Sequence, residues 1–349
     1  MVPNVIRLNN NTPVIKNVPS HLWENKVTFN PACALISDSG TLRTLIPQLP
    51  FDSATKRVLD THAALCFLLY RAQGRKTETY DFTRSSIGLA ILTPDLQLLA
   101  RHPEPVLLPD TEYDNLGVED PRITKMGDTF VMVYTAYSTG VPDNRIRIAL
   151  ATSTDFVHWE KHGLLKGDFN ELDNKNAMLL PGHIDGKLLM FHRPMAGVDA
   201  MSIHWAEGED LFGVWKSKGS LMKPRPNPEF VDTWIGGGAP PLCFGDHQYL
   251  VLYHIGNRKK DGTREYDLGI ALLTPHKEKP LLRREEPLLR PSTPAETSGD
   301  AELGVNNVVF ICGAYFHEGD LYFPYAGADS VVLGGKIGKE ELQRWASER

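Results

Sequence analysis

The chain repeats one short pattern five times. Each copy holds two neighbouring segments rich in apolar, β-branched or aromatic residues and bounded by turn-forming residues, as in a β-hairpin. The five pairs of segments are 68–71 with 87–90, 133–137 with 146–150, 189–193 with 201–205, 250–254 with 266–271, and 321–325 with 331–335. An aromatic residue lies in the first segment of every pair, and these aromatic anchors are Tyr70, Tyr134, Phe191, Tyr253 and Phe323. They recur at intervals of 57 to 70 residues, so five units of about 70 residues account for the 349-residue chain.

A hairpin that recurs five times, with room for two more strands in each unit, is typical of a β-propeller, in which four-stranded blades surround a central channel. We therefore predict an all-β fold, a five-bladed β-propeller. A large β-sandwich is the alternative, in which the units resemble one another through strand composition alone. Helical periodicity predicts a short terminal helix at 339–345 and a helical segment around 53–64. We expect one catalytic domain over residues 1–349, with an N-terminal extension of about residues 1–60 packing on it.

Charge and hydropathy argue against two classes of partner. The chain has 37 Lys and Arg residues against 43 Asp and Glu residues, a net charge of −6 spread along the sequence, so no overall field attracts nucleic acid. No segment approaches the ~20 apolar residues that span a bilayer, and residues 1–8 lack the pattern of a signal peptide, so we expect a cytoplasmic protein that does not bind membranes. The four cysteines, Cys33, Cys66, Cys243 and Cys312, lie far apart, which predicts buried thiols and no zinc site or disulfide framework. A homo-oligomer stays open, because symmetric interfaces leave no simple mark in a sequence.

Polar residues fall at comparable positions when the five units are aligned on their aromatic anchors. They are Arg71, Thr135 or Tyr137, His192 with Arg193, His254, and Tyr325 with the nearby Asp329. In a propeller these positions converge near the mouth of the channel. Burying several ionisable groups in one channel costs stability unless they are paired or serve a ligand. The alignment therefore predicts a polar binding site on the channel axis.

A carboxyl pair stands just before the strands of the second unit, in Gly117-Val118-Glu119-Asp120-Pro121-Arg122. The neighbouring proline constrains the turn and so fixes the direction of the side chains. Asp120 is a candidate general acid, with a pKa that burial is expected to raise. The alternative is an Asx turn that carries surface charges.

Cationic residues come from the first four units and form the second candidate group. They are Arg71, Arg145, Arg147, Lys175, His192, Arg193 and His254. Arginine forks match phosphate oxygens bidentately, and lysine and histidine add charge and donors, so this group predicts a phosphate pocket. For any one of them, a solvated hairpin position or a satisfied core histidine is the alternative. The chain has no His-Glu-x-x-His motif and no glycine-rich nucleotide loop, and we expect no metal site.

The chain resembles family 130 of the glycoside hydrolases, which comprises the β-mannoside phosphorylases and related β-mannosidases. The segments that carry the resemblance are 117–122, 147–151 with 155–160, 175–176 with 191–194, 236–241 with 252–254, and 325–330, in the same order and spacing as in the family. The resemblance implies a five-bladed propeller and gives Asp120 the role of the aspartate that protonates the glycosidic oxygen, in several members through a sugar hydroxyl. It places Arg147, Lys175, His192, Arg193 and His254 in motifs similar to those that hold phosphate. Among the residues expected to bind the oligosaccharide we include Arg71, Glu119, Tyr137, Asn176, Tyr325 and Asp329.

One acid combined with a basic cluster favours phosphorolysis over hydrolysis. An inverting glycosidase needs a second carboxylate to activate water, whereas a phosphorylase receives an anionic nucleophile and needs cations to hold it. We expect inverting phosphorolysis of terminal β-1,2- or β-1,4-linked mannosides to α-mannose 1-phosphate, with inorganic phosphate as co-substrate and no cofactor. Three alternatives stay open: a β-mannosidase of the same family, a glycosidase of another five-bladed family with several axial carboxylates, and a carbohydrate-binding propeller without turnover.

Overall fold

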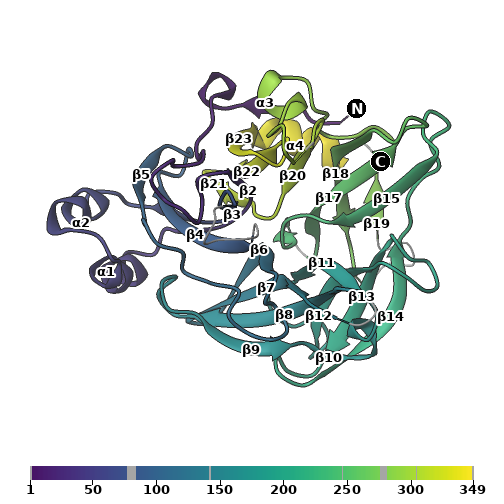
Figure 1. The fold of residues 1–349 in the computed structure, drawn as a ribbon, viewed down its shortest axis with the longest axis horizontal. Helices are drawn as coiled ribbons and strands as arrows, with labels where there is room; N and C mark the ends of the chain where they lie inside the picture. Colours follow the sequence, from purple (N-terminus) through teal and green to yellow (C-terminus); the bar gives the residue numbers. More distant parts are fainter. Residues whose placement is uncertain are drawn as a thin grey trace.

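The computed structural model describes six stretches of the chain, residues 2–76, 84–140, 143–245, 247–275, 281–303 and 305–347. Its strands form five antiparallel blades arranged in a ring, and the chain passes from blade to blade in sequence order (Figure 1). A single parallel bridge between Ser85 and Gly117 joins the first two blades into one continuous sheet. The predicted propeller is therefore the fold of the chain.

Four strands pair in each blade, and the first strand given for each blade is the innermost. The first blade consists of β2 (Val27–Ile36), β3 (Leu65–Gln73), β4 (Ser85–Leu92) and β5 (Leu98–Arg101), and the second of β6 (Gly117–Met126), β7 (Thr129–Ser138), β8 (Arg145–Ser153) and β9 (Glu160–Leu164). The third blade consists of β11 (Asn174–Leu179), β12 (Leu188–Pro194), β13 (Ile203–Gly208) and β14 (Val214–Met222), and the fourth of β15 (Asp232–Gly237), β17 (Tyr249–Arg258), β18 (Arg264–Leu273) and β19 (Leu281–Arg283). The fifth blade consists of β20 (Val309–Ile311), β22 (Asp320–Gly327), β23 (Val331–Ile337) and β1 (Ile6–Arg7). Three short strands extend these sheets, namely β10 (Lys166–Gly167), β16 (Leu242–Cys243) and β21 (Tyr315–His317).

The five hairpins predicted from the repeat are all present. They are β3–β4, β7–β8, β12–β13, β17–β18 and β22–β23. Every aromatic anchor is buried, and apolar side chains pack into five clusters, one between each pair of neighbouring blades. The anchors therefore mark the packing surfaces between blades.

The innermost strands share an irregularity that the repeat analysis did not include. The register of β2, β6 and β11 shifts at one point, and next to each shift stands a residue with positive φ: Asn30 at 46°, Asp120 at 50° and Asn176 at 56°. Asn and Asp adopt this conformation more readily than other non-glycine residues. The fourth innermost strand ends in Gly236 and Gly237 instead. Three blades thus place a polar side chain on the channel axis by the same bulge.

Helices α1 (Ser39–Gln48) and α2 (Ser53–Leu59) lie outside the ring of strands (Figure 1). They connect β2 to β3, α3 (Pro294–Thr297) precedes β20, and α4 (Lys339–Ser347) is the predicted terminal helix. α2 confirms the expected helical segment but ends five residues sooner, and α1 was not predicted. Two 3-10 turns span Asn9–Asn11 and Asp168–Asn170. None of these helices in the described residues is long and apolar enough to cross a membrane.

The prediction for the cysteines needs one correction. Cys33, Cys66 and Cys312 are buried thiols, as expected, but Cys243 is exposed. The reason is that Cys243 ends the short strand β16, which pairs only with β17 at one side of the fourth blade.

Candidate active site

A polar cavity of about 110 Å³ lies where the blades meet. All five blades contribute to it, through Asn30, Arg71, Asp120, Lys175, Asn176, Arg193, Tyr266, Val308, Phe310 and Asp329. Six of the residues predicted for the site are among them: Arg71, Asp120, Lys175, Asn176, Arg193 and Asp329. The volume corresponds to about four waters, which is enough room for a small anion.

Asp120 is almost completely buried in this cavity and is held on one side. Its Oδ1 accepts hydrogen bonds from Asn30 Nδ2 at 2.7 Å and from Arg71 Nη1 at 3.0 Å. The adjacent Arg122 fixes the backbone, because its Nη1 donates to the Asp120 carbonyl at 2.9 Å while its other nitrogens donate to the carbonyls of Gly237 and Gly238. The first blade therefore holds the Asp120 side chain, while Arg122 ties the Asp120 backbone to the fourth blade.

The expectation that burial raises the pKa of Asp120 is wrong. Burial does favour the neutral carboxyl, but the positive charges of Arg71 and Lys175, with that of Arg122, outweigh it and lower the pKa of Asp120 below its ordinary value. Asp120 is a carboxylate in this structure. The sequence analysis missed this because it considered the acid and the cations as separate groups.

Arg71 is the centre of a hydrogen-bond network at one wall of the cavity. Besides Asp120, it contacts Glu119 Oε1 through Nη2 at 2.5 Å and Ser85 Oγ through Nε at 2.8 Å. Its guanidinium also lies over the ring of Phe29, 4.6 Å from the centroid. Glu119 does not line the cavity, but this ion pair keeps it next to the residues that do. Arg71 therefore has its charge balanced by two carboxylates.

Lys175 and Arg193 differ from Arg71, because neither forms an ion pair with a carboxylate in the described part of the chain. Burial lowers the pKa of both groups from their ordinary values. A neighbouring cation lowers each pKa further, Arg193 that of Lys175 and Arg122 that of Arg193. Several buried polar atoms around them also have no hydrogen-bond partner among the described residues: Asn30 Oδ1, Asn176 Oδ1 and Nδ2, Arg193 Nε, His254 Nδ1 and Asp329 Oδ1. Native proteins seldom leave so many buried polar atoms unpaired in one place, so the cavity is built to receive a polar, anionic ligand.

Asp329 lies in the turn between β22 and β23 and faces the same cavity. Burial raises its pKa to about 6, against the opposing effect of Arg71, and the nearby charge of Asp120 adds to the increase. Two carboxyl groups in one cavity therefore differ in their affinity for a proton, Asp120 having the weaker and Asp329 the stronger.

The two predicted histidines do not line the cavity. His254 stacks on Phe310 with 3.6 Å between ring centroids, and its Nε2 lies 2.8 Å from the Ile311 carbonyl oxygen. His192 lies in blade three, where its Nδ1 is 2.9 Å from Asn174 Nδ2. Burial lowers the pKa of His192 to about 3 and that of His254 well below its usual range, so both imidazoles are neutral at pH 7. Neither adds positive charge to the site.

Three other predicted residues lie away from the cavity. Arg147 is on β8 beside the Arg145–Asp173 ion pair, and Tyr137 accepts a hydrogen bond from Asn144 Nδ2 at 3.0 Å. The Tyr325 hydroxyl donates to Glu296 Oε1 at 2.8 Å, close to the N-terminal strand. Position along a strand therefore did not distinguish inward-facing residues from those that face a neighbouring blade.

Sequence reasoning missed Asn30, Tyr266 and Phe310. Asn30 had a detectable signal, since Asn30-Pro31 in β2 matches Asp120-Pro121 in β6. Tyr266 and Phe310 had none, because aromatic residues are common in β-rich cores. Among the described residues, no group of three or more His, Cys, Asp or Glu side chains is placed to hold a metal ion.

Comparison with known proteins settles the family. The family model described as beta-1,4-mannooligosaccharide phosphorylase, of glycoside hydrolase family 130, matches residues 52–348. The chain belongs to family 130 of the glycoside hydrolases. A curated relative, the 1,2-beta-oligomannan phosphorylase of Thermoanaerobacter sp. (strain X514), is 30% identical over 326 residues, which are 92% of this chain and 93% of the relative. The predicted family and enzyme class are confirmed.

Solved structures agree on the fold. The β-1,2-mannobiose phosphorylase from Listeria innocua, in complex with β-1,2-mannobiose, superposes with a TM-score of 0.72 at 22% identity, covering 98% of each chain. A second structure belongs to a study of family 130 glycoside hydrolases that target β-1,2 mannosidic linkages in Candida mannan. It superposes with a TM-score of 0.75 at 23% identity, covering 97% of this chain and 95% of the other. At these identities the likeness confirms the predicted five-bladed propeller of the family 130 chain.

Proposed function

We propose that this family 130 enzyme catalyses the inverting phosphorolysis of terminal β-1,2-linked mannosides to α-mannose 1-phosphate. The observation that carries the proposal is that Lys175 and Arg193, which form no ion pair within the described residues, share a buried cavity with Asp120. The β-1,2 linkage is favoured over β-1,4 by the name of the curated relative that spans nearly the whole chain. We further propose a single catalytic domain that acts in the cytoplasm and needs no cofactor.

Phosphate in this proposal binds to Lys175 and Arg193. An arginine fork can contact two of its oxygens, and the ammonium group of lysine can contact a third. Held in this way, one phosphate oxygen attacks the anomeric carbon from the face opposite the glycosidic oxygen, so that the new C–O bond forms as the glycosidic bond breaks. The configuration at the anomeric carbon is thereby inverted.

Bound phosphate also helps Asp120 to acquire the proton that it must donate. The negative charge of phosphate offsets the cations that lower the pKa of Asp120, so Asp120 binds a proton more readily once phosphate is present. It gives this proton to the leaving oxygen, directly or through a sugar hydroxyl. Phosphate loses one proton when it becomes an ester, and this proton balances the one that Asp120 gives to the leaving oxygen. Productive turnover therefore favours phosphate being in place before the proton moves.

The remaining polar residues of the cavity are proposed to bind the sugar. Asn30, Asn176 and Asp329 offer unpaired donors and acceptors to hydroxyl groups in the cavity. The enclosed space is too small for a disaccharide, so the acceptor end of the substrate extends beyond the cavity, and Glu119 and Tyr137 are proposed to contact it there. His192 and His254 become positioning residues, which fix the walls behind Arg193 and Phe310, and Arg147 and Tyr325 act at a greater distance.

Product analysis tests the proposal. Wild-type protein is incubated with β-1,2- and β-1,4-mannobiose, with and without inorganic phosphate, and mannose 1-phosphate and mannose are quantified. We expect phosphate-dependent release of mannose 1-phosphate, faster from the β-1,2 substrate, and a rate lower by at least ~10²-fold in Asp120→Asn. Release of free mannose at a rate independent of phosphate would assign the protein to the hydrolases of the family.

A further inference from the structure

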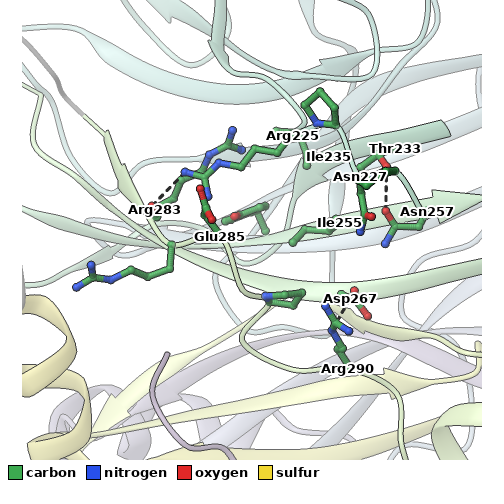
Figure 2. Close-up of a pocket in the computed structure, with 15 residues that line it drawn as sticks. Arg225, Asn227, Thr233, Ile235, Ile255, Asn257, Asp267, Arg283, Glu285 and Arg290 are labelled. Atoms are coloured by element: carbon green, nitrogen blue, oxygen red, sulfur yellow. Dashed lines mark hydrogen bonds and ion pairs between the residues drawn. The ribbon is translucent and has the colours of Figure 1, made fainter. Parts of the chain in front are cut away.

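A second and larger cavity, of about 440 Å³, lies against the fourth blade (Figure 2). Its floor is formed by side chains of β15, β17 and β18 that point away from the catalytic cavity, including Ile235, Ile255 and Asp267. The segment 225–228, which leads into β15, and the segment 283–290, which follows β18, form its walls. β18 therefore places Tyr266 in one cavity and Asp267 in the other.

Two guanidinium groups meet at one end of this cavity. Arg225 Nη2 lies 3.4 Å from the carbonyl oxygen of Arg283, and the Arg283 guanidinium lies close enough to the Tyr253 hydroxyl and to Arg225 to influence both electrostatically. Figure 2 shows the exposed Glu285 near them, but neither arginine forms an ion pair with a carboxylate among the described residues. Arg225 Nη1 is buried with no hydrogen-bond partner there. Two like charges are thus held together without a counter-ion, which costs stability unless an anion binds between them.

The other end of the cavity is suited to hydroxyl groups. Asp267 is buried, its Oδ1 has no hydrogen-bond partner among the described residues, and its Oδ2 is 3.9 Å from Arg290 Nε. Thr233 and Asn257, which hydrogen-bond to each other at 3.1 Å, line the same end of the cavity (Figure 2). A buried carboxyl, an amide and a hydroxyl side by side offer both donors and acceptors, as sugar binding requires.

We propose that this cavity binds a sugar phosphate, with its phosphate between Arg225 and Arg283 and its hydroxyl groups at Asp267, Thr233 and Asn257. A carboxylate has two oxygens and is satisfied by one arginine fork, whereas the three outer oxygens of a phosphate monoester use two forks and the Tyr253 hydroxyl. The volume lies in the range of small-ligand pockets, about 300–1,000 Å³. The inference rests on the fourth blade alone and holds whether or not the proposed reaction is correct.

Calorimetric titration of the full chain tests the inference. An Arg193→Gln background removes one cation of the axial cavity, so that the second cavity can be measured separately. The probes are mannose 6-phosphate, inorganic phosphate and mannose. We expect saturable binding of one mannose 6-phosphate per chain, tighter than that of inorganic phosphate and much tighter than that of mannose.

Variants then locate the binding. Arg225→Gln and Arg283→Gln should each weaken mannose 6-phosphate binding by at least about tenfold, because each removes charge-assisted hydrogen bonds. Asp267→Asn should weaken the binding of mannose 6-phosphate more than the binding of inorganic phosphate. The matched control is Arg258→Gln, which removes the same charge from the exposed end of β17, where Arg258 pairs with Asp232 at 3.0 Å, and should change the affinity less than twofold.

Three results would overturn the inference. They are no saturable binding in the Arg193→Gln background, unchanged affinity in both Arg225→Gln and Arg283→Gln, and inorganic phosphate binding as tightly as mannose 6-phosphate. Circular dichroism checks that each variant folds, and Arg225, which lies in a connecting segment, provides a test if Arg283→Gln does not fold. Phosphorolysis by Arg225→Gln in the Arg193 wild-type background should stay at the wild-type rate, which separates this site from the catalytic one.

Discussion

At the scale of single residues, Asp120 and Asp329 share one cavity but respond to it in opposite ways. Burial raises the pKa of Asp329 to about 6, whereas Arg71 and Lys175 overcome burial and lower the pKa of Asp120. Environments that separate the pKa values of two neighbouring carboxyls commonly mark different roles for them. The same difference has a consequence for folding stability that can be measured without substrate.

Neutralising either carboxyl should change stability with opposite sign at pH 8. Asp120 stabilises the fold as a carboxylate above its unfolded pKa of about 4, so Asp120→Asn should lower the free energy of unfolding at pH 8, and the loss should shrink as the pH falls below about 4. The folded pKa of Asp329 lies above its unfolded value, so its ionised form costs stability above pH 6. Asp329→Asn should raise the free energy of unfolding at pH 8 by on the order of 1–3 kcal/mol, and the gain should disappear near pH 4.

Urea unfolding of the wild type and the two variants at pH 8 and pH 3.5 measures these differences. Because both variants replace a carboxylate by an amide of the same size, differences in packing are small. Changes of the same sign at pH 8 would mean that the two carboxyls do not differ in environment as described.

Lys175 and Arg193 should contribute to the binding of phosphate and not to the binding of the sugar. Replacing Lys175 or Arg193 by Ala should raise the KM for phosphate by at least tenfold and change the KM for the mannoside by much less, because each removes charge-assisted hydrogen bonds to the anion. Steady-state kinetics with each substrate varied in turn gives both constants. Arg145→Ala is the control, since Arg145 pairs with Asp173 at 2.8 Å outside the cavity. An unchanged phosphate KM in Arg193→Ala would remove that residue from its proposed role.

At the scale of strands, three aromatic anchors lie directly opposite a glycine on the neighbouring strand. The pairs are Tyr70 with Gly88, Tyr253 with Gly269, and Phe323 with Gly335. A Cβ on any of these glycines would lie 2.3 to 2.4 Å from an atom of the ring, closer than van der Waals contact allows. The ring therefore occupies the space of the missing side chain and fixes how the second and third strands of the blade pack.

Gly335→Ala should consequently destabilise the fifth blade. We expect a loss of about 1–3 kcal/mol in the free energy of unfolding, since the added methyl group forces the buried Phe323 ring to move. Gly338→Ala is the matched control, because a Cβ there meets no atom within 4 Å. Equal unfolding midpoints in urea for the two variants would show that the ring can move without cost.

This pairing explains what could be predicted from the sequence. Hairpins such as β17–β18 carry long apolar segments with an anchor in a fixed place, so they were found from sequence alone. The innermost strands are bulged, and the bulge interrupts the alternation that identifies a strand, so the equivalence of Asn30 and Asp120 was missed. The neutral state of His192 depends on burial by other blades, which no local pattern shows.

At the scale of the whole molecule, the ring is closed by the two ends of the described chain. β1 pairs with β23, with Ile6 opposite Lys336 and Arg7 opposite Gly335, so an N-terminal strand completes the last blade. Two residues of β1 pair with β23, so the backbone hydrogen bonds between these strands are few. Side-chain contacts must therefore add to the closure.

Arg7 supplies these contacts. Its guanidinium binds the fully buried carboxylate of Glu296 bidentately, at 2.8 and 3.0 Å, and the same carboxylate accepts hydrogen bonds from the Tyr325 hydroxyl and from the backbone before α3. The arginine thus connects the first strand of the chain to α3 and, through Tyr325, to β22 of the fifth blade. Removing it would leave Glu296 buried without its cation.

Arg7→Ala should therefore lower the free energy of unfolding by about 2–4 kcal/mol, less than a fully buried pair because Arg7 is partly exposed. Arg7→Lys should recover only part of the loss, since an ammonium group cannot bind both carboxylate oxygens in the same plane. Arg344→Ala, which removes an exposed arginine that is 3.4 Å from Glu341, should cost less than about 1 kcal/mol. If Arg7→Ala and Arg344→Ala unfold at the same urea concentration, the backbone pairing of β1 with β23 is sufficient to close the ring, and the Arg7–Glu296 pair contributes nothing to it.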